Sequence, residues 1–350
     1  MGWYRLKIVG MKNSKIRKAM NLLDTYESLL KLEKNILIKE LNYDSNDIEL
    51  IRKSSEIKEY KKDLELRNIE VINLNDKEYP EELKNISLPP LFLYYMGNIS
   101  LLKERKIAVV GSRRGTKYGK NFIENLAKTF SENNIVTISG FAQGIDINIH
   151  REMLRNNGKT IAIMPCGLDR IYPTEHLKEW KEIIKKGLII SEYSIGIPPY
   201  PGNFPLRNRL IGGLGKGVVI VESGERGGSL ITAELALEEG RDVYALPGDI
   251  TSPFSIGCNN LIKNNRAKLI TCGIDILEEY QWNIKEKEKT FSIINNEENI
   301  VYQQLTTGMT IDELILCTNF DGKKLIGILS ELELKNMVIA LSGGRYKRKV

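Results

Sequence analysis

Residues 111–119 combine glycines with cationic side chains directly after a short apolar run, and this combination favours anion binding. The segment reads Gly-Ser-Arg-Arg-Gly-Thr-Lys-Tyr-Gly and precedes a stretch with helical periodicity. Glycines let the backbone approach an anion, and a helix start presents unpaired N–H groups with a partial positive charge. Arg113, Arg114 and Lys117 add full charges, and Ser112 belongs to the same predicted phosphate-binding loop. The segment is neither a Walker A sequence nor a clean G-x-G-x-x-G, and a tight turn with incidental surface arginines is the alternative.

Two further glycine-containing loops follow apolar runs later in the chain. Residues 139–146 contain Gly140 and precede a helical stretch. Residues 222–234 place Gly227-Gly228-Ser229 at another expected helix start, which predicts a second anion-accepting site. Three loops of this kind along one edge of a sheet would favour a functional site over three unrelated turns.

An aromatic residue stands close to two arginines in Phe204-Pro-Leu-Arg207-Asn-Arg209. This combination suits single-stranded nucleic acid, because a base can stack on the ring while guanidinium groups hold phosphates. The alternative is that Phe204 belongs to the core and that both arginines pair with acids.

The remaining reactive residues predict neither catalysis nor metal binding. The four cysteines are far apart without a C-x-x-C, and only His150 and His176 could join them as ligands. His150 is expected to be a hydrogen-bonded structural residue on a helix face. No catalytic residue, metal or cofactor is therefore predicted. The net charge of +6 alone does not establish nucleic-acid binding. No apolar run approaches the roughly 20 residues that span a bilayer, and the start lacks a secretion signal, so a cytoplasmic protein is expected.

Short β-branched runs alternate with helix-length segments between residues 107 and 280, which predicts an α/β fold with a parallel sheet covered on both faces. The expected strands are Ile107–Val110, Ile135–Ile138, Thr160–Ile163, Leu188–Ile190, Val218–Val221 and Val243–Leu246. Such a sheet binds its ligands at the carboxyl ends of its strands, where the loops above lie.

The two ends of the chain have different patterns. Residues 1–70 are helical in pattern, and residues 71–102 form a connector with prolines, included in a domain of residues 71–280. Residues 281–294 are expected to be a linker. Residues 295–350 predict three helices followed by a hairpin, which is the plan of a winged helix. Within it, Thr310-x-x-Glu313 has capping-box spacing.

The loops together resemble the DNA-processing protein A (DprA, also called Smf) family of natural transformation. The motifs that carry the resemblance are Gly111-Ser112-Arg113 with Tyr118-Gly119, Ser139-Gly140-x-Ala142-x-Gly144-Ile145-Asp146-x-x-x-His150, Gly167-Leu168-Asp169 with Tyr172-Pro173, Ser191-Glu192-Tyr193, Phe204-Pro205-x-Arg207-Asn208-Arg209, Gly228-Ser229-Leu230-x-Thr232-Ala233 and Pro247-Gly248. The resemblance implies a Rossmann-like core, a sterile-alpha-motif-like helical domain before it and a winged-helix-like domain after it. It also implies a non-enzymatic homodimer, formed through the core, that binds single-stranded DNA and loads RecA onto it.

The resemblance also implies roles for matching residues. Arg113 would clamp a phosphate, Phe204 would stack on a base with Arg207 and Arg209 nearby, and the amides of Gly140 and of Gly228-Ser229 would line the anion pocket. The chain departs from the family in three places, one of which is that its N-terminal domain keeps only Gly10 of a helix-hairpin-helix-like glycine pair. Some members carry a lysine where this chain has Pro199-Tyr-Pro-Gly-Asn203, and the usual asparagine after Tyr-Pro is His176.

Two other classes of function stay open. One is a nucleotide-processing enzyme with Glu234 as its catalytic carboxylate, although the loop before Glu234 has different spacing from that of phosphoribohydrolases. The other is a nucleotide sensor that signals through the C-terminal domain. That domain is expected to contact protein, or to bind DNA weakly through residues 345–349.

Overall fold

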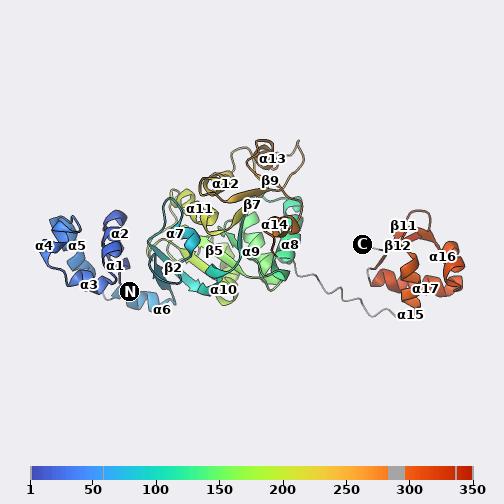
Figure 1. Cartoon of the computed structure of the whole chain (residues 1–350), viewed down its shortest axis with the longest axis horizontal. Coiled ribbons are helices and arrows are strands. Elements are labelled where there is room, and N and C mark those ends of the chain that lie inside the picture. Colours follow the sequence, from blue (N-terminus) through green and yellow to red (C-terminus); the bar gives the residue numbers. More distant parts are fainter. Residues whose placement is uncertain (1, 58, 283–295, 336, 349–350) are drawn as a thin grey trace. The chain divides into compact units, whose positions relative to one another are not determined.

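The computed structural model describes residues 2–57, 59–282, 296–335 and 337–348 (Figure 1). The chain divides into two compact units, Met1–Ile284 and Lys285–Val350, and each is described by itself. Of the predicted linker at residues 281–294, the part from residue 283 onward lies outside the described residues.

The first unit is built on a nine-stranded sheet with the order β1-β2-β6-β5-β4-β3-β7-β8-β9. The strands are β1 (Glu70–Asn73), β2 (Phe92–Gly97), β3 (Lys106–Gly111), β4 (Val136–Ser139), β5 (Thr160–Met164), β6 (Leu188–Ser191), β7 (Gly217–Val221), β8 (Asp242–Ala245) and β9 (Lys268–Leu269). All neighbours from β6 to β9 pair in parallel, whereas β1 with β2 and β2 with β6 are antiparallel. The six predicted strands are confirmed as β3 to β8. The predicted connector at residues 71–102 instead contributes β2 and nearly all of β1 to the sheet.

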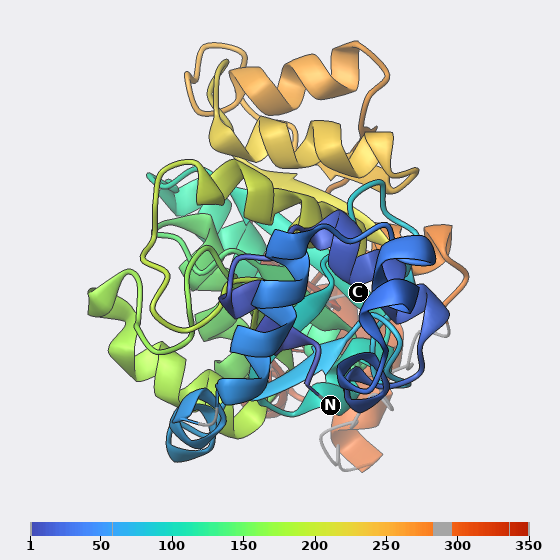
Figure 2. The same ribbon diagram turned by 90° about the vertical axis from the view of Figure 1, so that its left-hand side faces the viewer.

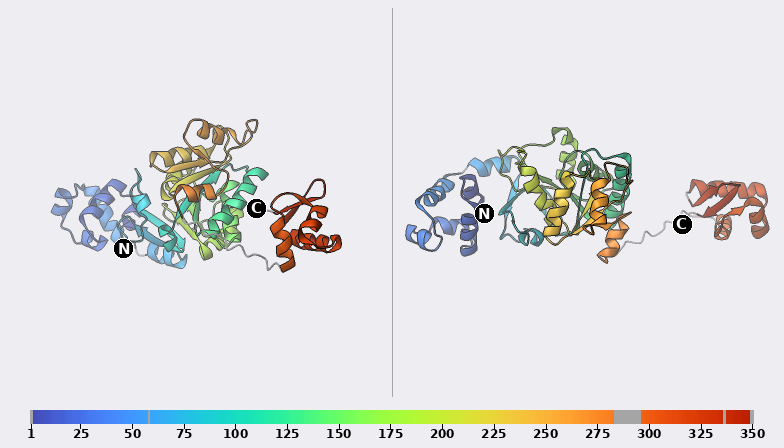
Figure 3. Two further views of the ribbon diagram at one scale, coloured as in Figure 1. Left: turned by 45° about the vertical axis from the view of Figure 1, so that its right-hand side comes forward. Right: turned by 90° about the horizontal axis from the view of Figure 1, so that it is seen from above.

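Helices cover both faces of this sheet (Figure 3). One face carries α8 (Lys117–Glu132), α9 (Ile145–Arg155), α10 (Leu177–Lys186) and α14 (Ile274–Glu279), and the other carries α7 (Glu81–Lys84), α11 (Asn203–Leu214), α12 (Gly228–Glu238) and α13 (Ile256–Lys263). Strand residues alternate between the two layers. In β3, Ile107 and Val109 pack against the α8 layer, while Ala108 and Val110 pack against the α11 layer. Because both faces are buried, the strands read as continuous apolar runs.

The chain reverses its direction of winding between β3 and β7. From β3 it moves outward through β4, β5 and β6, and it then returns to place β7 on the other side of β3. Val110 of β3 lies opposite Ile220 of β7. In open α/β sheets, such a switch point separates the two neighbouring loops and leaves a crevice at the carboxyl ends of the strands.

Six short helices precede the sheet and gather at its β1–β2 side (Figure 2). They are α1 (Tyr4–Ile8), α2 (Asn13–Leu22), α3 (Tyr26–Leu30), α4 (Lys34–Lys39), α5 (Ser45–Glu56) and α6 (Glu59–Leu66). Hydrogen bonds join them to the sheet domain: Arg17 Nη2 donates to the Pro89 carbonyl at 3.0 Å, and the Ile195 N–H donates to the Tyr60 hydroxyl at 3.1 Å. The predicted helical character of residues 1–70 is present, and the predicted boundary falls where β1 begins. The likeness of these helices to a sterile alpha motif stays a prediction.

The second unit contains three helices and a three-stranded sheet of order β10-β12-β11. Its elements are α15 (Asn296–Gln304), β10 (Met309–Thr310), α16 (Ile311–Thr318), α17 (Gly322–Leu334), β11 (Val338–Leu341) and β12 (Arg345–Arg348). Thr310 and Glu313 form the predicted capping box, and Asp321 caps α17 by accepting the Lys324 N–H. The three helices and the hairpin are thus present, with β10 as an additional strand. The winged-helix assignment remains a prediction.

Candidate functional site

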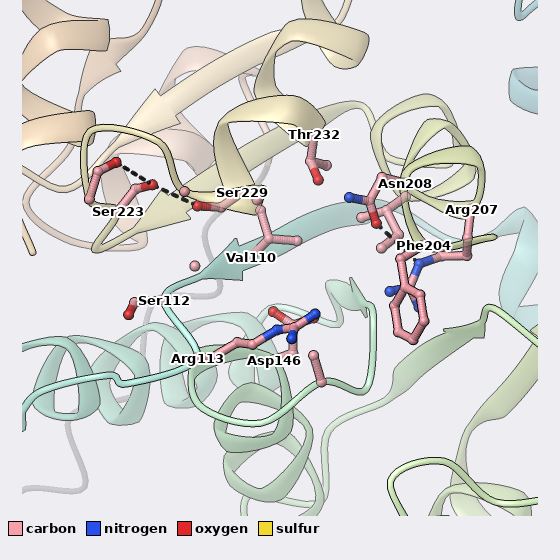
Figure 4. A pocket seen from close by; sticks show the side chains of 16 residues that line it. Val110, Ser112, Arg113, Asp146, Phe204, Arg207, Asn208, Ser223, Ser229 and Thr232 are labelled. Carbon is pink, nitrogen blue, oxygen red and sulfur yellow. Dashed lines mark hydrogen bonds between the residues drawn. The ribbon is translucent and has the colours of Figure 1, made fainter. Parts of the chain in front are cut away.

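The loops after β3 and β7 meet α11 around a cavity of about 330 Å³ at the switch point (Figure 4). Seven of the predicted site residues line this pocket: Ser112, Arg113, Phe204, Arg207, Gly227, Gly228 and Ser229. The pocket joins four stretches of the chain, within residues 110–113, 142–146, 204–211 and 223–232. We call it the switch-point pocket.

Gly140, in the loop after β4, lines a neighbouring cavity of about 320 Å³. Arg113 and Phe204 line both cavities. The Tyr172 ring also lines the second cavity and meets the Phe204 ring edge to face, with centroids 5.7 Å apart. The two cavities therefore lie side by side with an aromatic ring and an exposed arginine between them. The sequence signalled Tyr172 only through the Tyr-Pro motif, and a site role for it was not predicted.

The N-terminus of α12 faces the switch-point pocket through Gly227-Gly228-Ser229. Among the residues that the structure describes, the amides of Gly228 and Ser229 find no acceptor. The Ser229 hydroxyl donates to Ser223 Oγ at 2.9 Å, which fixes the turn (Figure 4). A helix start with free amides and the positive end of the helix dipole can accept an anion.

The N-terminus of α8 is occupied by the protein itself. The Glu222 carboxylate accepts the Thr116 N–H at 2.7 Å and the Thr116 hydroxyl at 2.5 Å, and Thr116 Oγ1 caps the Tyr118 N–H. Glu222 is buried and has a left-handed backbone (φ +57°). An anion at this helix start would meet the Glu222 carboxylate. The expectation of an open anion site here is therefore wrong, because a residue 106 positions away in sequence already fills it.

Arg207 is a buried residue that ties the loops together. Its Nη1 donates to the Gly140 carbonyl at 2.8 Å and also to the Ile163 carbonyl. The Asp146 carboxylate lies beside it and accepts the Gly140 N–H at 3.1 Å. A Cβ on Gly140 would lie 2.7 Å from both Arg207 Nη2 and Asp146 Oδ2, which explains the glycine at this position. Arg207 therefore mainly holds the surrounding loops in place, whereas the sequence predicted it beside the base.

Burial shifts the ionisation of this buried pair. Desolvation raises the pKa of Asp146 to about 6, although the charge of Arg207 opposes the shift. Desolvation lowers the pKa of Arg207 to about 10, so that it stays protonated at neutral pH. Arg113 is exposed, and its side chain reaches across the pocket towards Asp146 (Figure 4). The pocket lining therefore contains one exposed arginine and one buried arginine, with the Asp146 carboxyl near both.

Three predicted cations lie elsewhere. Arg209 forms an ion pair with Glu192, with Nη2 and Oε2 2.5 Å apart, and lines a different groove. Arg114 and Lys117 are exposed and line neither of the two adjoining cavities. Residue type alone suggested all three, because the sequence does not reveal which face of α11 or of the loop each side chain occupies.

The residues considered for catalysis have structural partners. Glu234 forms a two-point ion pair with Arg266 at 2.7 and 2.8 Å, and it does not line the switch-point pocket. His150 is buried and its Nδ1 lies 2.6 Å from Thr160 Oγ1, and burial lowers its pKa to about 3. His150 is therefore neutral, and its expected structural role is confirmed.

Within the described residues, no three His, Cys, Asp or Glu side chains come together as metal ligands. Nor does any helix described here combine the length and apolar character needed to cross a membrane.

The parallel sheet, its switch point and the anion-accepting loops define a Rossmann-like α/β protein with a pocket that pairs an aromatic ring with cationic groups. Residues 70–281 match the family described as DNA recombination-mediator protein A. The chain belongs to this family.

Relatives and solved structures agree with this assignment. The DNA processing protein DprA of Streptococcus pneumoniae is 38% identical over 279 residues, which cover 80% of this chain and 97% of that protein. The protein of the same name from Bacillus subtilis is 40% identical over 61% of this chain and 72% of its own length. The crystal structure of the S. pneumoniae protein superposes with a TM-score of 0.69 over 80% of this chain and 98% of that one. A Helicobacter pylori DNA processing protein A, whose structure concerns its single-stranded DNA binding mode, is 32% identical and has a TM-score of 0.56 over 61% of this chain and 97% of that one.

Proposed function

We propose that this chain is a non-enzymatic recombination mediator that binds single-stranded DNA, protects it and loads RecA onto it during natural transformation. The observation that carries the proposal is the convergence of Arg113, Phe204 and the free amides at the start of α12 on one pocket. A cytoplasmic location and a homodimer formed through the sheet domain belong to the same proposal, which draws on the family.

The geometry supplies a separate partner for each part of a nucleotide. A phosphate fits at the α12 amides, where Arg113 can reach it, because both offer N–H donors and positive charge. A base fits against the Phe204 ring, with the adjoining cavity on its other side. Bases within a duplex are paired and stacked, so an unpaired strand meets this arrangement with the smaller cost. The ligand class of the H. pylori relative supports the same conclusion.

A nucleotide-processing enzyme is the second candidate, and the ion pair between Glu234 and Arg266 counts against it. We propose that the protein releases no base from nucleoside monophosphates. Release of free base by the purified protein, detected by chromatography, would establish the enzyme instead. A nucleotide sensor would bind a mononucleotide but not oligo(dT).

Fluorescence anisotropy with labelled oligo(dT) tests the proposed function. Arg113→Ala and Phe204→Ala should each weaken binding by about 10-fold or more, since a stacked base contributes roughly 1–3 kcal/mol. Phe204→Leu keeps an apolar side chain without a ring and should behave like Phe204→Ala. Affinity should also fall steeply with salt.

Arg155→Ala is the control, because it removes another exposed arginine at the far end of α9, about 14 Å along the helix from Asp146. Its affinity should equal that of the unmodified protein. If Arg113→Ala and Arg155→Ala bind alike, the pocket is not the DNA site.

A further inference from the structure

A second hollow, of about 930 Å³, lies between the N-terminal helices and another face of α11. Leu206 and Arg209 of α11 line it, whereas Phe204 and Arg207 line the switch-point pocket. On the opposite wall are Lys7 and Arg17. We call this hollow the α2–α11 groove. No residue lines both the groove and the switch-point pocket.

The groove lining carries more positive than negative charge, with Lys7, Arg17 and Arg209 against Glu192. Lys7 Nζ donates to the Asn13 side-chain oxygen at 2.7 Å, and Arg17 Nη2 donates to the Pro89 carbonyl. In the described part of the chain, neither has a carboxylate partner at ion-pair distance. The one acid in the groove, Glu192, is paired with Arg209. The groove thus has a net positive charge, which complements a polyanion.

Most of the remaining lining is aromatic or aliphatic, with Asn13, Ser14 and Ser194 as polar members. Tyr200 is 59% exposed and Leu206 is 55% exposed, so both offer apolar surface to a ligand. Flat aromatic and aliphatic surfaces beside cations suit a single strand, because bases pack against them while the backbone stays near the charges.

The groove and the switch-point pocket share one segment of the chain. Tyr200 stands four positions before Phe204, and the Asn203 carbonyl between them accepts the Tyr193 hydroxyl at 3.4 Å. Because this one segment contributes a ring to each site, it offers a strand a path from Phe204 to Tyr200.

We propose that the α2–α11 groove is a second contact site for the same unpaired strand, with bases against Tyr200 and Leu206 and phosphates near Lys7 and Arg17. This inference rests on the proposed single-stranded DNA binding. An acidic protein segment could also bind to these cations. If the groove bound only protein, however, its residues would not contribute to the dependence of DNA affinity on strand length.

Binding of the full chain to labelled oligo(dT) of about 4 to about 20 nucleotides tests this inference. Affinity should increase with length. The variant Lys7→Glu/Tyr200→Ala should match the unmodified protein with the shortest strands and bind the longest ones about 10-fold more weakly. Its salt slope with long strands should be smaller by about 1.

Lys18→Glu is the charge-matched control, because Lys18 is exposed on α2 and does not line the groove. The Lys18→Glu variant should show the same increase of oligo(dT) affinity with strand length as the unmodified protein. Lys7→Glu/Tyr200→Phe should recover part of the loss, since the ring is retained. If the double variant unfolds more readily than the unmodified protein, Leu206→Gln on the opposite wall takes its place. Its affinities for short and long strands are then compared in the same way.

Equal affinities of the double variant and the unmodified protein at every length would overturn the inference while leaving the proposed function intact. If the unmodified protein binds short and long strands with equal affinity, the inference is also overturned and the proposed function stands. Failure of the unmodified protein to bind any strand would overturn the proposed function, and this inference with it.

Discussion

Arg113 and Arg207 line the same pocket, yet their surroundings give them different roles. Arg113 is exposed and free to meet a ligand, while Arg207 is 3% exposed and donates to two backbone carbonyls. A buried cation with backbone acceptors holds loops in place, because its removal leaves those acceptors without their donor and takes away the positive charge beside the Asp146 carboxyl.

Arg207→Met should therefore destabilise the first unit by about 3 kcal/mol, since it removes one member of a buried charged pair. Arg113→Ala should change the free energy of unfolding by less than about 0.5 kcal/mol, as expected for an exposed side chain. Urea denaturation measures both. Equal stability of the two variants would contradict the supporting role of Arg207.

Asp146 gives the pocket a pH dependence. Its folded-state pKa of about 6 lies above the unfolded value of about 4, so the folded protein takes up a proton there as pH falls. That proton removes a negative charge beside Arg113 and Arg207. DNA affinity should therefore rise as the pH falls from about 7.5 to about 5. Protonation of Asp146 should also increase the stability of the folded state as the pH falls from about 6 towards about 4.

Asp146→Asn should bind DNA with little change over this range, because its side chain is neutral throughout. His150 does not imitate the effect, because burial lowers its pKa to about 3. A variant that keeps the full pH dependence would show that another group is responsible.

The starts of α8 and α12 look alike in sequence and differ in structure. Both follow a glycine-containing loop at the end of a buried strand. The Glu222 carboxylate closes the start of α8, whereas the amides at the start of α12 stay open. We therefore expect the proposed anion site at the start of α12.

Gly228→Pro removes one of the open N–H groups at the start of α12 and so tests whether this helix start binds the phosphate. Proline fits the first position of a helix, and Gly227 before it already has the extended backbone that a following proline requires (φ −73°, ψ 144°). A Cβ at position 228 would meet no atom within 4 Å. The variant should fold normally and bind DNA about 5- to 10-fold more weakly, because one N–H donor to a charged phosphate is lost.

Gly228→Ala is its control, since it keeps the amide and should bind normally. Normal binding by Gly228→Pro, measured by anisotropy, would place the phosphate elsewhere.

The sequence predicts the central strands well and the supporting contacts poorly. Runs such as Val218–Val221 are apolar throughout because both faces of a parallel strand are covered. The edge strand β1 was missed, since Glu-Val-Ile-Asn is short and half polar, and its neighbour β2 was taken as part of the connector. Local patterns indicated Arg113 and Phe204 correctly as pocket residues, because both lie in loops at strand ends or helix starts.

Contacts between distant residues have no local signal. The hydrogen bonds from Arg207 to the Gly140 and Ile163 carbonyls, and from Thr116 to Glu222, depend on how the strands are ordered in the sheet. Arg209 was assigned to the pocket because its type suited phosphate, although its position on α11 directs it to the groove.

At the scale of the whole chain, all lining residues of both cavities and of the groove belong to Met1–Ile284. A protein truncated after Ile284 should therefore keep the oligo(dT) affinity of the full chain, and Lys285–Val350 alone should bind weakly or not at all. Anisotropy with both fragments checks this. A clear loss of affinity on truncation would assign a DNA contact to the second unit.

The position of β7 beside β3 has a consequence during synthesis. The Arg113 side of the pocket leaves the ribosome more than a hundred residues before Ser229 does, and the cavity has no second wall until the returning strand pairs with Ile107–Gly111. A nascent chain that ends before β7 thus cannot hold a nucleotide. Under the proposed function, DNA binding therefore requires that β7 has already paired with β3.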